Sequence, residues 1–131
     1  MHTSTVVAAV LLHDNKVLIA RRKADDDNGG LWEFPGGTVH EGESPASCLQ
    51  REIREELGIA IIVRRQFITA THDGSTARIK LITYLAEPQS LAIKALDHDE
   101  IRWVAIADLA DYSFTPADKA VVSALLKQTR L

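Results

Sequence analysis

Residues 36–59 read GGTVHEGESPASCLQREIREELGI and contain the clearest structural signal in the chain. Ser44 suits the N-cap of a helix, and Pro45 suits the first turn, where its missing N–H is not needed. Gly58 follows the periodic segment and can take the left-handed conformation that ends many helices. The pattern therefore predicts a helix from Ser44 to Leu57.

Three acids of this helix share one side, because Glu52, Glu55 and Glu56 are spaced at i, i+3 and i+4 and fall within about a 100° arc. The apolar stripe beside them consists of Ala46, Leu49, Ile53 and Leu57. Since Glu56 neighbours Leu49 by angle, we expect at least one acid at the edge of the core. Clustered carboxylates suit Mg²⁺ or Mn²⁺, which bridge substrate phosphates. The alternative is a solvated face paired internally through Arg51 and Glu55.

The rest of the chain predicts a sheet covered by helices, that is, an α/β fold. Lys23–Gly30 is polar and is expected to be a loop, as is the glycine-rich segment Gly36–Glu43. Strands are predicted at Val6–Leu12 and Lys16–Ala20, which would form a hairpin, and at Ile59–Ile68, Ala77–Ala86 and Ile101–Ile106. A last helix is expected to begin at Thr115-Pro116.

Length and composition favour one ordinary globular domain over residues 1–131. A net charge of −3 and a pI near 5.9 argue against long nucleic acid as a partner. Cys48 is the only cysteine, and the chain has neither a basic apolar leader nor a run of about 20 apolar residues. We therefore expect a cytoplasmic protein with no membrane partner.

The segment from Gly37 to Ile59 resembles the Nudix box, the signature of the Nudix hydrolase family. Its fixed positions are filled by Gly37, Glu43, Arg51, Glu52, Ile53, Glu55, Glu56, Gly58 and Ile59. This resemblance implies the Nudix fold, a mixed β-sheet sandwiched between helices in α/β/α layers.

The resemblance also implies site residues. Glu52, Glu55 and Glu56 would be metal ligands together with the carbonyl of Gly36. Arg51 would orient Glu52 and Glu43. The reaction would be in-line attack by an activated water on a bridging diphosphate, with Glu52 or a later loop acid as general base.

Outside the box, three segments resemble the MutT-type branch of the family: Ala20–Arg22, Leu31–Gly37 and Phe114–Asp118. That branch places a further acid before its last strand, where Asp97 stands here, with Asp99 and Glu100 as neighbouring candidates. An aspartate is a departure from the usual glutamate, and its shorter side chain would reach the metal directly or through water.

Asp118 matches the position at which this branch reads the nucleobase. An ionised carboxylate accepts hydrogen bonds, so it would favour the cytosine N4 amino group or the guanine N1–H with its N2 amino group. The alternative is a capping box with Thr115. Further substrate-binding candidates are Arg22, Trp32, Phe34 and Gly37, and their alternatives are surface ion pairing for Arg22 and a core role for the aromatics. His72 and Cys48 are interpreted as structural.

The segments Gly30–Phe34 and Pro116–Asp118 resemble the CTP and 5-methyl-dCTP pyrophosphohydrolases of that branch. This predicts Mg²⁺-dependent hydrolysis of (d)NTP to (d)NMP and pyrophosphate by a monomer or homodimer, with Mn²⁺ as a possible substitute. The alternatives are an 8-oxo-dGTP hydrolase, an ADP-ribose or nucleoside diphosphate sugar hydrolase, and a nucleotide sensor without turnover.

Overall fold

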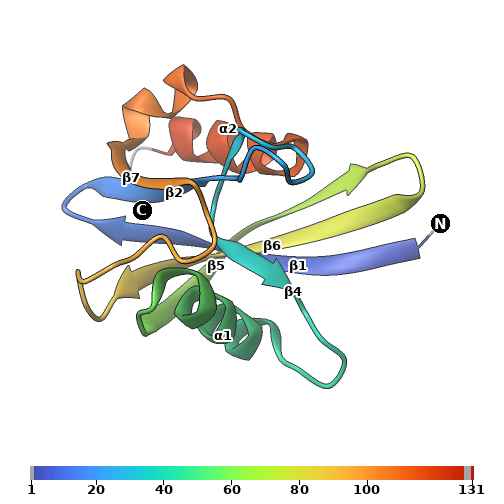
Figure 1. Cartoon of the computed structure of the whole chain (residues 1–131), viewed down its shortest axis with the longest axis horizontal. Coiled ribbons are helices and arrows are strands. Elements are labelled where there is room, and N and C mark those ends of the chain that lie inside the picture. Colours follow the sequence, from blue (N-terminus) through green and yellow to red (C-terminus); the bar gives the residue numbers. More distant parts are fainter. Residues whose placement is uncertain (1, 129–130) are drawn as a thin grey trace.

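Strand β1 (His2–His13) is the centre of the sheet in the computed structural model, which describes residues 2–128 and 131 (Figure 1). Its neighbour β6 (Ala77–Pro88) runs parallel to it over almost its whole length. On the other side β1 pairs antiparallel first with β4 (Gly36–Thr38) and then, at its end, with β2 (Lys16–Arg21). The predicted hairpin of β1 and β2 is confirmed, but most of β1 pairs with other strands.

The remaining strands extend the sheet outward from this centre. β5 (Ile61–Asp73) is antiparallel to β6, with irregular register between Val63 and Thr69. β2 pairs with β7 (Glu100–Ala105) and with the short β3 (Trp32–Glu33). Parallel and antiparallel pairs therefore coexist, and the predicted mixed sheet is confirmed.

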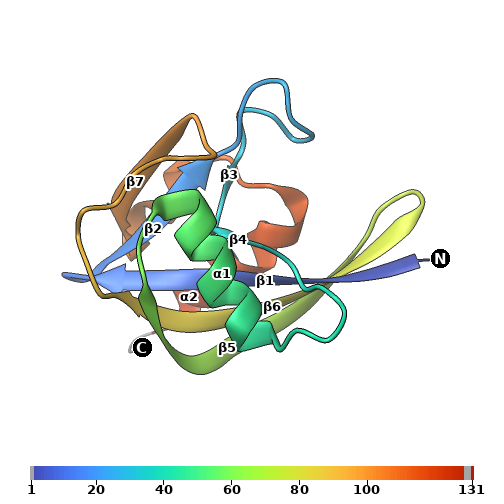
Figure 2. The same cartoon turned by 60° about the horizontal axis from the view of Figure 1, so that its bottom comes forward.

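Helices cover both faces of the sheet. Helix α1 (Pro45–Leu57) lies on one face, and α2 (Lys119–Lys127) lies on the other beside two 3₁₀ turns, η1 (Ile106–Asp111) and η2 (Pro116–Asp118) (Figures 1 and 2). The predicted α/β/α layering is confirmed. No helix within residues 2–128 and 131 is long and apolar enough to cross a membrane.

Alternation along β1 divides the core into two parts. Val7, Ala9 and Leu11 pack with the apolar stripe of α1, whereas Ala8 and Val10 pack on the face of α2. Because both faces are covered, β1 is apolar in continuous sequence rather than in alternation.

The ends of α1 follow the sequence prediction. The side chain of Ser44 accepts a hydrogen bond from the backbone N–H of Ser47 at 3.2 Å. Gly58 has φ of 71° and donates its backbone N–H to the carbonyl of Arg54 at 3.0 Å. These local caps fix where the acid-bearing helix starts and stops.

Several predicted boundaries are wrong. Gly36–Thr38 is not loop but strand β4, because the absence of side chains lets Gly36 approach the backbone of Val7 closely. The strand predicted over Ile59–Ile68 begins at Ile61 and continues to Asp73, paired with β6. The last helix begins at Pro116 with the 3₁₀ turn η2 and becomes α-helical only at Lys119. Ile106, predicted as the end of a strand, opens the 3₁₀ turn η1.

Candidate active site

A cavity of about 500 Å³ opens between β1, β4 and η2. Of the sequence candidates, Arg22, Phe34, Gly36, Gly37 and Asp118 line it, and Glu33 and His72 line it as well. Trp32 is not among its lining residues in the described part of the chain. The cavity thus joins segments from the first, middle and last thirds of the sequence.

Beside this cavity, Arg51 of α1 gathers three acids. Its Nε and one terminal nitrogen donate to the two carboxylate oxygens of Glu43 at 2.8 and 3.1 Å. Its other terminal nitrogen donates to Glu52 at 2.9 Å and to Glu55 at 3.3 Å. We call this group, Arg51 with Glu43, Glu52 and Glu55, the arginine network.

The arginine network stabilises the charged form of its acids. Hydrogen bonds from Arg51 and from the backbone N–H of His40 hold the pKa of Glu43 at about 2. The side chain of Glu55 is 59% exposed, so its pair with Arg51 is an ordinary i, i+4 surface contact. Arg51 therefore makes the surface pair with Glu55 and also contacts Glu52 and Glu43, the two acids that it was expected to orient.

Gly37 connects α1 to the cavity. A Cβ at this position would collide with the carboxyl group of Glu52, so that carboxyl lies directly against the backbone of β4. Gly37 itself lines the cavity. The contact of the Glu52 carboxyl with Gly37 leaves no room for a side chain at position 37. The same contact places Glu52 next to a residue that lines the cavity.

Glu56 is the buried acid that its angle beside Leu49 predicts, with only 5% of its surface exposed. Burial raises its pKa far above the ordinary range, and the hydrogen-bonded Glu52 and the nearby charges of Glu33 and Asp97 raise it further. Burial therefore favours the protonated form of this carboxyl when no cation is bound beside it. A metal ion would relieve the repulsion that keeps it so.

The donor set fits a hard divalent cation in its chemistry, since Glu52, Glu55, Glu56 and Asp97 offer only oxygen. The donors are not yet assembled: no three acidic or histidine side chains within residues 2–128 and 131 are gathered closely enough to hold a metal. Glu55 points to Arg51, and Asp97 is exposed on the segment before β7.

At the other side of the cavity, Asp118 is buried, with 6% of its surface exposed. Burial raises its pKa to about 7, although the hydroxyl of Thr115 donates a hydrogen bond to its carboxylate and opposes the shift. Thr115 makes no side-chain bond to the helix backbone. The capping-box alternative for these two residues is therefore not observed.

The two candidate aromatics have different surroundings. The Phe34 ring stacks on Phe114 at a centroid distance of 5.4 Å and lines the cavity. Trp32 packs edge-on against Tyr112 at 5.3 Å, and the guanidinium of Arg102 lies over it. Trp32 is thus a core residue beneath a surface arginine, away from the cavity.

Arg22 has two partners at the cavity. Its Nε donates to the backbone carbonyl of Asp27 at 2.6 Å, and a terminal nitrogen donates to Glu33 at 3.0 Å. The pairing with the aspartate loop that was considered for Arg22 is therefore made through a backbone oxygen. The same contacts fix the guanidinium at the edge of the cavity.

Sequence reasoning missed Glu33 and His98, which meet in the interior. The Nε2 of His98 lies 2.8 Å from Glu33 and 3.8 Å from Glu56. These residues are 65 positions apart, so spacing alone does not connect them. A usable signal was the charged Glu33 between two buried aromatics, since an acid in such a run needs a partner.

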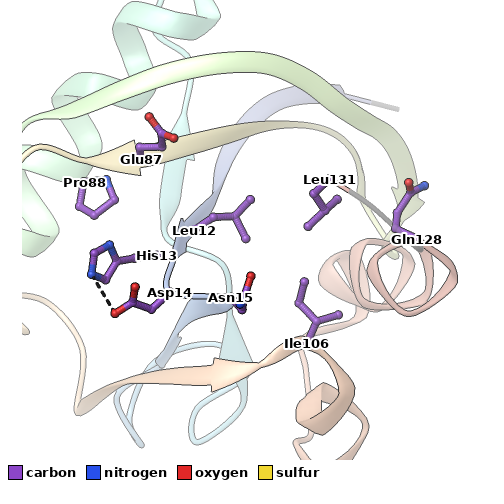
Figure 3. A pocket seen from close by; sticks show the side chains of 9 residues that line it. All are labelled: Leu12, His13, Asp14, Asn15, Glu87, Pro88, Ile106, Gln128 and Leu131. Atoms are coloured by element: carbon purple, nitrogen blue, oxygen red, sulfur yellow. Dashed lines mark ion pairs between the residues drawn. The ribbon is translucent and has the colours of Figure 1, made fainter.

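A larger cavity, of about 720 Å³, lies at the far end of β1 (Figure 3). It is lined by Leu12 and Ile106 with the exposed pair of His13 and Asp14, whose nitrogen and oxygen are 3.5 Å apart. None of the acids of α1 reaches it. The smaller cavity is the better candidate site, because the buried Asp118 lines it together with Gly37, whose backbone lies against the carboxyl of Glu52.

Comparison with known proteins agrees with this geometry. Residues 6–124 match the model of the NUDIX domain family. The CTP pyrophosphohydrolase of Escherichia coli (strain K12) is 35% identical over 121 residues, which cover 92% of this chain and 90% of that protein. The 8-oxo-dGTP diphosphatase of Proteus vulgaris is 38% identical over 81 residues, covering 60% of this chain and 72% of that protein.

Among solved structures, the solution structure of the E. coli ORF135 protein superposes with a TM-score of 0.84 at 34% identity, covering 96% of this chain and 90% of that one. The family match over residues 6–124 and the relative that is 35% identical over 92% of the chain agree with the Nudix box on α1. The chain therefore belongs to the Nudix hydrolase family, in its MutT-type branch, and is a nucleotide pyrophosphohydrolase.

Proposed function

We propose that this chain hydrolyses nucleoside triphosphates to the monophosphate and pyrophosphate with Mg²⁺, or Mn²⁺ in its place, and that cytosine nucleotides are its preferred substrates. One observation carries the proposal: Gly37, which covers the carboxyl of Glu52, and the buried Asp118 line the same cavity. A base beside Asp118 would direct its phosphates toward Glu52. The volume of about 500 Å³ is in the range of small-molecule sites.

The residues around Glu52 have the chemistry that the reaction needs. A bound divalent ion supplies positive charge to the phosphate oxygens and acidifies water. Glu52, Glu55, Glu56, Asp97 and the Gly36 carbonyl would hold it. Arg51 positions Glu52 and Glu43 through the contacts of the arginine network. The proton of the attacking water would pass to Glu52 or Asp97, the two carboxylates available as general base.

The base preference rests on Asp118. Thr115 donates to one of its carboxylate oxygens, and a carboxylate has further acceptor capacity for the N4 amino group of cytosine. Phe34, stacked on Phe114, lines the same cavity and offers an apolar surface to the ring. The relative with 35% identity, named for CTP, supports the same preference.

One observation favours 8-oxo-dGTP as a second candidate. Because the pKa of Asp118 is about 7, a protonated form that donates a hydrogen bond is also present near neutrality. An oxidised purine offers acceptors to such a donor. The relative from Proteus vulgaris carries that activity in its name.

The proposal is tested by pyrophosphate and phosphate release from CTP, dCTP, 5-methyl-dCTP, dGTP, 8-oxo-dGTP, dATP and ADP-ribose, with Mg²⁺ and with chelator. Metal-dependent pyrophosphate release that is fastest on the cytosine nucleotides is the expected result. Fastest release from 8-oxo-dGTP would keep the reaction and replace the base assignment. No turnover on any of these compounds would contradict the proposed activity. A cytoplasmic location, where nucleotide pools lie, completes the proposal.

A further inference from the structure

The segment between β6 and β7, residues 89–99, lies mostly on the surface, and Ile93 is partly buried against the core. His98 is its only buried residue, and its side chain is 4% exposed. Its neighbours Asp97 and Asp99 are exposed. The loop thus sends one polar ring into the interior immediately after the acid that is a candidate metal ligand.

The ring of His98 stands between two acids of different parts of the site. Its Nε2 is 2.8 Å from Oε2 of Glu33, which lines the cavity, and 3.8 Å from Oε1 of Glu56 on α1. The other oxygen of Glu33 accepts from Arg22 at 3.0 Å. Both oxygens of Glu33 are therefore held, one from each side.

Backbone bonds attach the same loop to α1 and to β2. The N–H of Leu96 donates to the carbonyl of Glu56 at 2.9 Å, and the N–H of Asp99 donates to the carbonyl of Arg21 at 3.0 Å. Asp97 lies between these two attachments. His98 lies between the same two attachments, next to Asp97 in the chain.

The chemistry of the ring argues against simple space filling. A carboxylate can only accept, so Nε2 carries the hydrogen that is donated to Glu33. Nδ1 of His98 is buried without a hydrogen-bond partner in the described part of the chain. An unpaired buried nitrogen is costly, and an apolar side chain would avoid that cost. The hydrogen bond from Nε2–H to Glu33 therefore has a role that offsets the cost of the unpaired Nδ1.

We propose that His98 is a positioning residue that links the cavity lined by Glu33 and Asp118 to helix α1. It holds Glu33 through Nε2–H and keeps the neighbouring Asp97 near Glu56. This inference rests on the proposed metal-dependent function. Residues that orient metal ligands change metal affinity or activity by about 10- to 100-fold when replaced.

Two conservative variants of His98 separate the effect of its hydrogen bond to Glu33 from the effect of its side-chain volume. In His98→Gln the amide nitrogen can reach the place of Nε2, whereas in His98→Asn it reaches only the place of Nδ1. We expect His98→Asn to weaken Mn²⁺ binding without substrate by about tenfold or more and to lower kcat, with His98→Gln within about threefold of wild type. His13→Asn, at the far end of β1, is the control and should change neither.

Mn²⁺ affinity is measured by electron paramagnetic resonance on the metal-free protein, and kcat and KM are measured on CTP. Equal Mn²⁺ affinity and equal kcat for His98→Gln and His98→Asn would overturn the inference. Should His98→Asn not fold, Glu33→Ala removes the acceptor of the same hydrogen bond, and wild-type Mn²⁺ affinity in that variant would overturn the inference. Wild type that binds Mn²⁺ but hydrolyses no nucleotide would instead defeat the proposed function, and the binding comparison would still decide the role of His98.

Discussion

The acids of this site fall into two regions with opposite electrostatics. In the arginine network, Glu43, Glu52 and Glu55 surround one guanidinium, and the pKa of Glu43 is held at about 2. In the interior, Glu56 and Asp118 are buried, and burial raises the pKa of both. Arg51 supplies a positive charge to the outer acids, whereas under the proposed function a bound metal would supply it to Glu56 and a base would contact Asp118.

The largest effect should come from an acid that is exposed and easily replaced. Glu55→Gln is expected to lower kcat by more than about 100-fold while leaving the melting temperature near that of wild type, because only a surface ion pair is lost. Turnover of CTP and circular dichroism on heating measure the two quantities. Glu41→Gln, on the exposed loop before α1, is the control. Wild-type kcat in Glu55→Gln would show that Glu55 does not belong to the metal site.

Without a metal, the buried carboxyl of Glu56 should make the stability of the protein depend on pH. A carboxyl whose pKa is raised on folding keeps a proton that the unfolded chain loses above its ordinary pKa, so stability falls as pH rises above about 4.5. A metal that binds ionised Glu56 offsets this loss. The gain in melting temperature on adding Mg²⁺ should therefore grow from about pH 5 to about pH 8.

Glu56→Gln sharpens the same comparison. Without Mg²⁺ at alkaline pH, this variant should melt at a higher temperature than wild type, since it has no buried carboxyl to ionise, and it should respond weakly to Mg²⁺. A wild type whose melting temperature ignores both pH and Mg²⁺ in this range would show that Glu56 is not the buried acid of the metal site.

Substitution of Asp118, the proposed base-contacting residue, should give a smaller change, mainly in KM. Since the pKa of Asp118 is about 7, the acceptor form increases as pH rises through neutrality, and KM for cytosine nucleotides should fall. Stability has the opposite trend, because ionisation of this buried group favours the unfolded chain between about pH 4 and pH 7. Asp118→Asn should remove both dependences and raise KM by about tenfold.

Steady-state kinetics from pH 6 to pH 8.5, with Asp108→Asn as an exposed control, measure this dependence. An unchanged KM and an unchanged pH profile in Asp118→Asn would mean that the base contacts other residues of the cavity.

The smallest effect belongs to a pair outside both regions. Arg64 and Glu87 are about half exposed, and their nitrogen and oxygen are 2.7 Å apart. Arg64→Ala should destabilise the protein by at most about 1 kcal/mol in urea unfolding and leave kcat unchanged. A loss of kcat here would show that distant surface charge contributes to the site.

The sequence predicts what local chemistry determines. Ser44 and Gly58 cap α1 through contacts within one turn, and the repeat of Leu49 and Ile53 decides which side is buried. The burial of Glu56 follows from the same angles. The α/β/α layering follows from the Nudix box together with the order of the elements.

Other features depend on contacts between distant segments, and spacing does not reveal these. Strands β3 and β4 have only two and three residues and exist because β2 and β1 pair with them. Trp32 and Phe34 look equivalent in sequence, yet only Phe34 lines the cavity. The contact of His98 with Glu33 joins the loop before β7 to β3, so it becomes visible only once the sheet is assembled.

The most direct test of the central claim is ³¹P NMR of CTP incubated with the wild-type protein, with Mg²⁺ and then with chelator. The account predicts CMP and pyrophosphate in the presence of Mg²⁺ and unchanged CTP in the presence of chelator. CDP and phosphate as products, or turnover that survives the chelator, would contradict it.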